Sequence, residues 1–290
     1  MMKLTLLGTG RMGFPMARRL CQAGHQLHVW NRSADKAAPL AADGATVHAS
    51  AAGAAAAGEL VISLLENGPV VASVLFDQGV AAAMRPGSLF IDMASIKPAE
   101  AREHAVRLAE RGVQALDAPV SGGTVGAEAG TLAIMVGGAA ADFARAQPVL
   151  QLLGRATHVG PHGAGQLAKL ANQMIVGITI GAVAEALLLC EKGGADPARV
   201  REAIGGGFAE SRILQLHGER MVQRDFAPRG RMTVQLKDMR NALDTAQGMG
   251  FDAPITAALE RLYADGVAHG DADLDHSGLF VELARRNGMA

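Results

Sequence analysis

Residues 3–33 read KLTLLGTGRMGFPMARRLCQAGHQLHVWNRS, which predicts a strand, a glycine turn, a helix and a second strand. The apolar run Lys3–Leu7 predicts a buried strand that leads directly into the turn GTGRMG. In such a turn the first glycine permits a tight bend, the second lets the backbone approach a pyrophosphate, and the third lets the next helix pack on the strand. The N–H groups at the start of that helix favour phosphates. The residues predicted to line this dinucleotide site are Gly8, Gly10, Arg11, Met12 and Gly13.

The end of the second predicted strand indicates which dinucleotide is bound. Residues Leu27–Trp30 read as a strand, and Asn31, Arg32 and Ser33 follow it. A site for NAD usually has Asp or Glu here, which accepts hydrogen bonds from the ribose, and this chain has no acid at the position. Arg32 can instead form a forked pair with a 2′-phosphate, with further donors from Asn31 and Ser33, although in isolation it reads as an exposed arginine. The pattern favours NADP and leaves NAD as the alternative.

The composition is that of a chain with a large apolar core. Of the 290 residues 49% are hydrophobic but only 3% are aromatic, so aliphatic side chains must supply the packing. The formal net charge of −1 argues against nucleic acid as a partner, because nucleic-acid-binding domains are usually basic. Cys21 and Cys190 lie far apart in apolar contexts. We therefore expect a reduced, cytoplasmic chain with two buried thiols.

One segment, Met174–Cys190, has the composition of a membrane span. It contains Glu185, however, and it is shorter than the roughly 20 apolar residues that a span needs. We therefore expect no membrane association and a helix that is buried on all sides within the fold. Because this helix is more apolar than a domain boundary requires, we also expect a homodimer or homotetramer that covers part of it.

Short apolar runs alternate with helical patterns through the first part of the chain, which predicts an α/β fold with a doubly wound parallel sheet. The predicted strands are 3–7, 27–30, 45–48, 60–65, 89–93, 113–117, 132–136 and 158–159, and the predicted helices between them include 33–43, 51–57, 69–76, 98–111 and 140–153. A long helix, 164–192, comes next, and only helices follow it, at 196–204, 211–224, 234–249, 254–268 and 277–287. We therefore expect a nucleotide-binding domain over residues 1–162 and an all-α domain for substrate binding and dimerisation over residues 163–290.

The segment DAPVSGG, residues 117–123, lies at the carboxyl end of a predicted strand, where open α/β sheets bind their ligands. Successive N–H groups around Ser121, Gly122 and Gly123 can form a concave anion site, to which Ser121 adds a hydroxyl. A small substrate that bears a carboxylate is the expected guest. The alternative is a plain turn with two glycines.

The segment GQLAKLANQ, residues 165–173, opens the long helix. Lys169 and Asn172 are three residues apart and so share one face of it, among apolar neighbours. A lysine that is desolvated beside a nicotinamide has a lowered pKa, and it can pass a proton to a carbonyl oxygen as hydride reaches the carbon. Asn172 can hold the same oxygen or the carboxylate. The alternative for Lys169 is a surface lysine whose ammonium group reaches water.

Two further groups of residues could act as ligands. The segment Leu236-Lys237-Asp238 is expected at a helix start, where Lys237 can reach a cofactor or substrate and Asp238 can favour the helix dipole. A solvated helix end explains the same residues. The nine histidines show no metal-binding spacing, and we expect no metal. We expect the arginines between Arg199 and Arg240 to form a solvated helical surface.

Five segments, in order, resemble the β-hydroxyacid dehydrogenase family of oxidoreductases, which act on 3-hydroxyisobutyrate, tartronate semialdehyde and related semialdehydes. They are GTGRMGFPMARRL at 8–20, DAPVSGGTVGAEAGTLAIMVGG at 117–138, GAGQLAKLAN at 163–172, LKDMRNAL at 236–243 and DHSGL at 275–279. The resemblance implies a Rossmann-type domain, catalysis by Lys169 and substrate binding by Asn172 and Ser121–Gly123. It also implies that Lys237 contacts the cofactor and that the chain around Leu64, Leu65 and Ser95 lines the nicotinamide pocket.

Three positions depart from the pattern of this family. Glu66 stands where many members have proline, and Ala94 stands where serine is common. Gln173 replaces a frequent second asparagine after Asn172, which bears on how the far end of the substrate is held.

Two other functions compete with a hydroxyacid dehydrogenase. Imine reductases share the two-domain plan and a similar end to the second strand, but they generally lack a lysine at the position of Lys169. A nucleotide-binding scaffold without catalysis is the third hypothesis, and retention of Lys169 argues against it. The expected function is hydride transfer between NADP and a small β-hydroxy acid or its semialdehyde.

Overall fold

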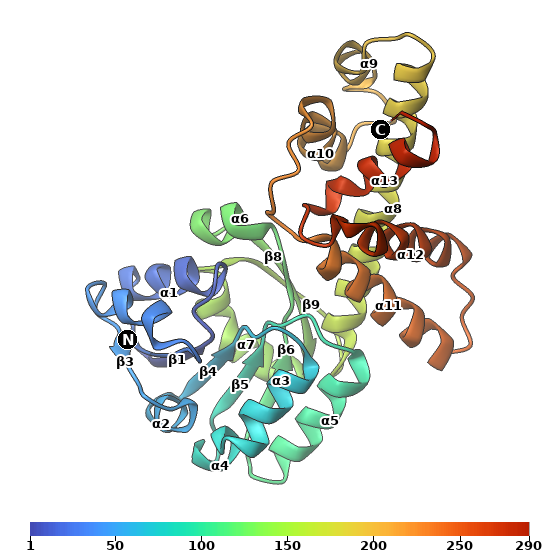
Figure 1. Cartoon of the computed structure of the whole chain (residues 1–290). Coiled ribbons are helices and arrows are strands. Elements are labelled where there is room, and N and C mark those ends of the chain that lie inside the picture. The colour runs from blue at the N-terminus through green and yellow to red at the C-terminus, as the bar shows by residue number, and fades with distance from the viewer. Residues whose placement is uncertain (290) are drawn as a thin grey trace. The chain divides into compact units, whose positions relative to one another are not determined.

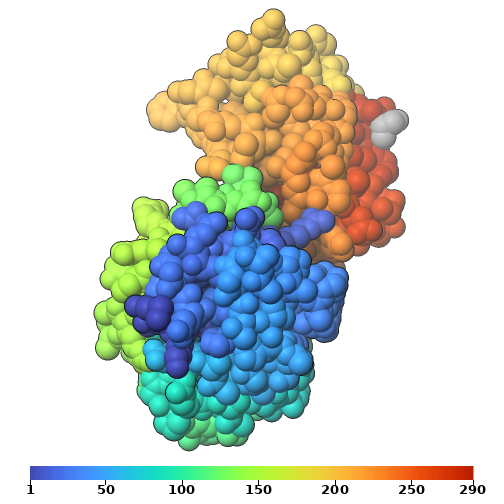
Figure 2. Space-filling view, turned by 90° about the vertical axis from the view of Figure 1, so that its left-hand side faces the viewer, coloured from blue at the N-terminus to red at the C-terminus, as the bar shows by residue number. Residues whose placement is uncertain are grey.

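The computed structural model describes residues 1–289 and divides the chain into two compact units, Met1–Lys169 and Leu170–Ala290 (Figure 1). The division falls within the long helix α8, Ala164–Lys192, which begins next to the expected boundary at residue 163. In the space-filling view of Figure 2, the N-terminal segment, drawn in blue, forms much of the visible surface of the first unit.

The first unit is built on a nine-stranded sheet in the order β3-β2-β1-β4-β5-β6-β8-β7, with β9 paired to β8. Its strands are β1 (Lys3–Leu7), β2 (Gln26–Trp30), β3 (Thr46–Val47), β4 (Leu60–Ser63), β5 (Leu89–Asp92), β6 (Gln114–Asp117), β7 (Val120–Ser121), β8 (Leu132–Gly138) and β9 (Gly154–Gly160). From β3 to β6 all neighbours are parallel, and the strand order reverses at β1. This doubly wound order places ligands at the carboxyl ends of the strands next to the reversal.

The sheet departs from the expected all-parallel arrangement at one end. β8 runs antiparallel to both β6 and β7, so the predicted parallel arrangement is confirmed for β1 to β6 and for the pair β8 and β9, but not where β8 joins β6 and β7. The connection from β6 to β8 holds β7 and the short helix α6, Gly123–Ala129, neither of which was predicted. β7 pairs antiparallel with β8, so the chain turns back between these two strands and β8 returns along β6.

Helices cover both faces of this sheet. Alternate residues of the central strands enter two separate apolar clusters, one with α1 (Gly13–Gln22) and α7 (Ala140–Leu150), the other with α2 (Ala51–Ala57), α3 (Gly68–Ala72) and α5 (Pro98–Ala109). Two shorter elements, a π-helical turn at Ser73–Asp77 and α4 (Val80–Ala83), follow α3. The strands are therefore buried on both sides, as their continuous apolar sequences predict.

The helix predicted over residues 33–43 is wrong. The segment forms two short 3₁₀ helices, Ala34–Lys36 and Ala38–Ala41. Pro39 lacks the N–H that an α-helix would require there, and it lies near the start of the second 3₁₀ helix.

Over its described residues, 170–289, the second unit contains helices and no strand, as predicted. Its elements are most of α8, then α9 (Pro197–Ile204), α10 (Arg212–Gln223), α11 (Met232–Gly248), α12 (Pro254–Gly266) and α13 (Leu279–Arg286), with a π-helical turn at Val267–Asp271 and a 3₁₀ helix at His276–Gly278. α9 and α10 begin at side-chain caps from Asp196 and Ser211. The core packs Met221, Met239, Tyr263 and Phe280 against α8.

The expectation that α8 is buried on all sides is wrong. Ile175 and Leu189 are 67% and 71% exposed. Of the most apolar 18 residues of the helix, 39% are buried. Among residues 1–289 it is the one helix whose length and composition would suit a membrane span, criteria that helices packed within their own chain also meet. Cys21 and Cys190 are both free. They are half-buried, however, and not buried as expected.

Candidate functional site

The glycine turn after β1 has the geometry that a bound pyrophosphate requires. Gly8 has φ of +102°, and a Cβ there would collide with the carbonyl of Leu64. A Cβ at Gly13 would collide with the carbonyl of Gly8, so this third glycine allows α1 to pack against the turn. A Cβ at Gly10 would meet no protein atom within 4 Å. The turn is therefore closely packed at its first and third glycines and open at its second, as a phosphate cradle must be.

The end of β2 is tied to this turn through Asn31. Its side-chain oxygen accepts the N–H of Thr9 at 3.0 Å, and its amide nitrogen donates to the carbonyl of Ser33 at 3.0 Å. Asn31 is thus engaged in holding the turn, a contact that the sequence did not predict. Arg32, between the two half-buried residues, is exposed and accessible to a ligand at this edge. Arg11 is also exposed, and Met12 is the half-buried residue before α1.

The start of α8 is anchored to the carboxyl end of β6. The Asp117 carboxylate accepts the N–H of Gly163 at 2.8 Å and that of Gln166 at 2.9 Å. Such bonds satisfy N–H groups that a helix start leaves without partners. Lys169 lies one turn further along α8 and is only 9% exposed, so it is buried rather than extended into water. This contradicts the surface alternative, and the catalytic role of Lys169 stays a prediction.

The side chain of Gln166 joins the same helix to the loop that contains Ser95. Its oxygen accepts the N–H of Ile96 at 3.1 Å, and its nitrogen donates to the carbonyl of Ala94 at 2.8 Å. Gln166 is fully buried, and these two bonds hold the residues on either side of half-buried Ser95. The structure therefore fixes the Ser95 loop and the Lys169 helix relative to one another within the first unit.

Two buried carboxylates lie side by side at this end of the sheet. Asp92 and Asp117 are register partners on β5 and β6, and the hydroxyl of Ser63 donates to Asp92 at 2.8 Å. Burial raises the pKa of Asp92 to about 7, and it also raises the pKa of Asp117. Neither Asp92 nor the anchoring role of Asp117 was predicted, although an acid at the end of an apolar strand was the available signal for both.

The predicted carboxylate site forms the junction of β7 and α6. Ser121 is half-buried at the end of β7, and Gly122 and Gly123 are exposed with φ of +137° and +63°. Residues other than glycine rarely adopt these φ angles. The two glycines therefore let successive backbone N–H groups face a ligand.

In the second unit, the predicted residues Asn172 and Lys237 belong to one polar network. Asn172 donates to the Gln173 side chain at 2.8 Å, Gln173 donates to Asp238 at 2.7 Å, and the Lys237 ammonium lies 3.2 Å from the same carboxylate. Asp238 is 2% exposed, in the second turn of α11. The interpretation of Asp238 as a charge at the helix start is therefore wrong, because α11 begins at Met232.

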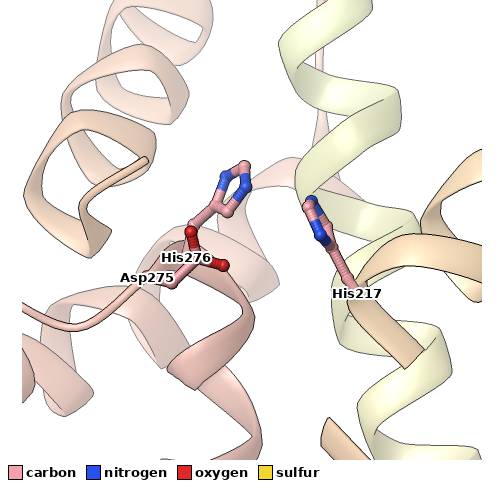
Figure 3. A group of neighbouring side chains, drawn as sticks. All are labelled: His217, Asp275 and His276. Carbon is pink, nitrogen blue, oxygen red and sulfur yellow. The ribbon is translucent and has the colours of Figure 1, made fainter. Parts of the chain in front are cut away.

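His217, Asp275 and His276 also gather in the second unit, with possible metal-ligand atoms within 4.8 Å of one another (Figure 3). The Arg220 guanidinium contacts both His217 Nδ1 and Asp275 Oδ1, at 3.2 and 3.1 Å. Gly230 and Ser277 donate to the same carboxylate. Arg220 thus supplies the cation of this cluster, which joins α10 to the loop before α13. It also corrects the expectation that all these arginines are solvated.

Burial lowers the pKa of His217, and the neighbouring His276 and Arg220 lower it further. Burial opposes the charge of Asp275, but His276 and the hydrogen bonds of Ser277 and Gly230 hold its pKa below the usual range. A neutral His217 can accept the Arg220 hydrogen bond. The sequence missed this cluster because His217 and Asp275 lie on separate elements.

Family models match both parts of the chain. Residues 3–160 match the NAD binding domain of 6-phosphogluconate dehydrogenase, and residues 163–283 match the NAD-binding domain of NADP-dependent 3-hydroxyisobutyrate dehydrogenase. The first match covers the glycine turn and both buried carboxylates, and the second covers Lys169 and the network around Asp238.

Related proteins match nearly the whole length of the chain. The chain is 45% identical over 284 residues to 2-hydroxy-3-oxopropionate reductase of Escherichia coli (strain K12), with 97% of each chain covered. It is 39% identical to 3-hydroxyisobutyrate dehydrogenase of Pseudomonas aeruginosa, with 96% of each covered. A solved structure of Mycobacterium tuberculosis 3-hydroxyisobutyrate dehydrogenase with L-serine is 36% identical and superposes with a TM-score of 0.90, covering 98% of this chain and 99% of that one.

Proposed function

Because this chain belongs to the β-hydroxyacid dehydrogenase family of NAD(P)-dependent oxidoreductases, we propose that it transfers hydride between NADP and a small acid with a β-hydroxyl, or the matching semialdehyde. The observation that carries this proposal is the placement of Lys169, which is buried on a helix whose start is bonded to Asp117 and to the Ser95 loop. An ammonium held in this way can serve a proton transfer at a fixed position.

The residues of the chain divide the remaining work. A bound nicotinamide supplies the hydride during reduction or accepts it during oxidation. Lys169 donates a proton to the carbonyl oxygen of the semialdehyde, and in the reverse direction it removes that proton from the hydroxyl. Ser121, Gly122 and Gly123 hold the substrate carboxylate, Asn172 binds a second polar group, and Lys237 contacts the cofactor. Burial of the lysine excludes water that would otherwise exchange this proton.

The preference for NADP rests on the residues after β2. Arg32 is exposed at the end of β2. None of the residues at positions 31–33 is an acid that could accept a hydrogen bond from a ribose 2′-hydroxyl. A guanidinium recognises a phosphate through paired hydrogen bonds, which a hydroxyl cannot match. The family model for the second part of the chain is named for an NADP-dependent enzyme, which supports the same choice.

A panel of small 3-hydroxy acids and semialdehydes, each assayed with NADP(H) and NAD(H), tests this proposal. We expect turnover of at least one acid or semialdehyde with NADP(H), and a lower kcat/KM with NAD(H). Absence of turnover with either cofactor would refute the hydroxyacid dehydrogenase. Reduction of cyclic imines in its place would establish the competing imine reductase.

We also propose a homodimer or homotetramer in which a second copy covers the exposed side of α8. Ala171, Ile175, Ala182, Ala186 and Leu189 are exposed and recur at spacings that place them on one side of the helix. Light scattering should give the mass of an oligomer, and Ile175→Glu should shift it towards the monomer. A monomeric wild-type protein would contradict this proposal.

A further inference from the structure

Arg19, on α1, donates hydrogen bonds to two backbone carbonyls far along the chain, one of them at the end of α6. We propose that Arg19 is a positioning residue: by holding α6 against α1, it fixes the backbone N–H groups of Gly122 and Gly123 for the substrate carboxylate. This inference rests on the proposed function, and it adds a residue that sets substrate affinity without touching the substrate.

The first step is the contact itself, which lies within the first unit. The Nη1 of Arg19 donates to the carbonyl of Glu128 at 3.1 Å, and its Nε donates to the carbonyl of Leu152 at 2.9 Å, in the turn before β9. The Glu128 carbonyl belongs to the last turn of α6, where carbonyls lack partners within the helix and a cation is favoured. A Cβ at Gly130 would collide with the guanidinium, so the glycine there leaves room for Arg19.

The second step is that α6 depends on such contacts for its position. A helix of seven residues is not stable on its own, so its tertiary contacts decide where it lies. It packs against α1, and Ala127 is buried in the same apolar cluster as Met16 and Leu20 (Figure 1). Without the two bonds of half-buried Arg19, α6 loses its directional link to α1 and to the turn before β9.

The third step is the effect of α6 on the proposed carboxylate site. Ser121 is held in the sheet opposite Ala133 of β8. Because α6 begins at Gly123, a displacement of α6 is taken up by Gly122 and Gly123. Both have positive φ, and glycine has the most backbone freedom to lose on becoming ordered. Arg19 therefore keeps their N–H groups in one orientation before the acid binds, which lowers the entropy cost of binding.

Other contacts hold the cofactor site and the proposed acid. The glycine turn is tied to β2 through Asn31, and Asp117 anchors the start of the helix that carries Lys169. Neither contact involves Arg19. We therefore expect Arg19 to act on substrate binding, and to leave cofactor binding and proton transfer unchanged.

The test measures the kinetics of Arg19→Met on glycerate and on 3-hydroxyisobutyrate with NADP. Methionine keeps the apolar part of the side chain but donates no hydrogen bond. The KM for the acid should rise about five- to tenfold, while kcat and the Kd of NADP change less than twofold, because the lost contact serves ground state and transition state alike. An unchanged KM would overturn the inference. A loss of kcat and of NADP affinity as large as the rise in KM would also overturn it.

Arg18→Met is the matched control. Arg18 lies on the same helix and pairs with Asp43 at 3.3 Å, away from α6, and its loss should leave the KM within twofold of the wild type. Arg19→Lys keeps a cation that can reach one carbonyl, so its KM should lie between those of the wild type and Arg19→Met. It also serves as the test variant if Arg19→Met does not fold. A KM above that of Arg19→Met would contradict the hydrogen-bonded role.

A double-mutant cycle shows whether the effect passes through this contact. Gly130→Ala places a methyl group where the guanidinium lies and should also raise the KM for the acid. In an Arg19→Met background, the same substitution should change the KM less than twofold. A further severalfold rise in that background would contradict a route through Arg19.

Hydrogen exchange of the cofactor-free protein gives a readout that does not need turnover. The amides of residues 123–129 should exchange faster in Arg19→Met than in the wild type or in Arg18→Met. Equal exchange in all three proteins would overturn the link between Arg19 and α6, whatever the kinetics show. Wild-type protein that oxidises neither acid would instead refute the proposed function, and the carboxylate role with it.

Discussion

Asp117 accepts the backbone N–H of Gln166 at 2.9 Å, and this bond joins the carboxyl end of β6 to the helix that carries Lys169. The other oxygen of the same carboxylate accepts the N–H of Gly163, so one buried side chain holds the first turn of α8 at two points. Gln166 extends the connection to both sides of Ser95. The position of the proposed acid therefore depends on residues that need not touch the substrate.

Asp117→Ala should lower both stability and turnover. Two N–H groups at the start of α8 lose their acceptor, which costs about 1–3 kcal/mol in the free energy of unfolding. The freed helix start also displaces Lys169, and we expect kcat to fall about tenfold or more. Chemical denaturation and steady-state kinetics measure the two effects. Asp117→Asn, which keeps one amide oxygen as acceptor, should lose less of both; a larger loss would show that the helix anchor is not what matters.

The glycines of the turn should separate folding from cofactor binding. Gly10→Ala adds a methyl group that meets no protein atom, so the melting temperature of the cofactor-free protein should remain that of the wild type. The same methyl group lies where the pyrophosphate approaches, and the cofactor Kd should rise by at least about tenfold. Gly13→Ala is the contrasting variant, because its methyl group collides with the Gly8 carbonyl and should lower the melting temperature. Calorimetric titration and thermal unfolding give both quantities.

Arg32→Asp should change which cofactor is used. The substitution removes the guanidinium and introduces a carboxylate, which repels a 2′-phosphate and accepts hydrogen bonds from ribose hydroxyls. We expect the ratio of kcat/KM for NADP to that for NAD to fall about 10²-fold or more. Arg32→Gln separates the two contributions, since it removes the charge without adding the acceptor. A ratio that neither variant alters would refute the assignment of Arg32 to the phosphate.

Much of this fold was predictable because its strands are buried on both faces and so appear as apolar runs between helices. The start of α9 also followed from local signals, the cap Asp196 and Pro197 at the first helical position. The direction of β8 was not predictable, since apolar periodicity is the same for parallel and antiparallel strands. The segment over residues 33–43 misled because its alanines favour a helix, while Pro39 removes a donor.

Features of the candidate site were predictable where all the residues that form them lie in one short motif. The glycine turn and the burial of Lys169 are of this kind. The partners that orient these residues come from distant elements, and nothing in a local pattern pairs Gln173 with Asp238 or Gln166 with Ala94. A polar residue among apolar neighbours near a helix start was the available signal for both glutamines, and it indicates that a partner exists without identifying it.

Lys169→Met should remove the proton transfer and leave cofactor binding intact. Methionine preserves the apolar length of the buried side chain, so the variant should fold, and kcat should fall about 10²–10⁴-fold. NADP affinity should change less than threefold, because the glycine turn and Arg32 remain. Near-normal turnover would remove Lys169 from its proposed role. Lys169→Arg keeps a cation that does not release its proton at neutral pH, and it should be nearly as inactive.

The free energy of unfolding should depend on pH because of the buried carboxyl group of Asp92. Burial raises the pKa of Asp92 from near 4 to about 7, so the folded state binds a proton that the unfolded state has already released between these values. The contribution of Asp92 to stability is therefore fully present below about pH 4, and it is lost as the pH rises through 7. Asp117, whose pKa is also raised, acts in the same direction.

Asp92→Asn removes this titration while keeping an oxygen that can accept from Ser63 and from the N–H of Ala94, which bond to one oxygen of Asp92. The variant should gain stability relative to the wild type as the pH is raised from 4 to 8, by on the order of 1–4 kcal/mol. Urea unfolding at several pH values gives the difference directly. A difference that is constant across this range, or that falls with pH, would show that Asp92 is ionised in the folded protein throughout.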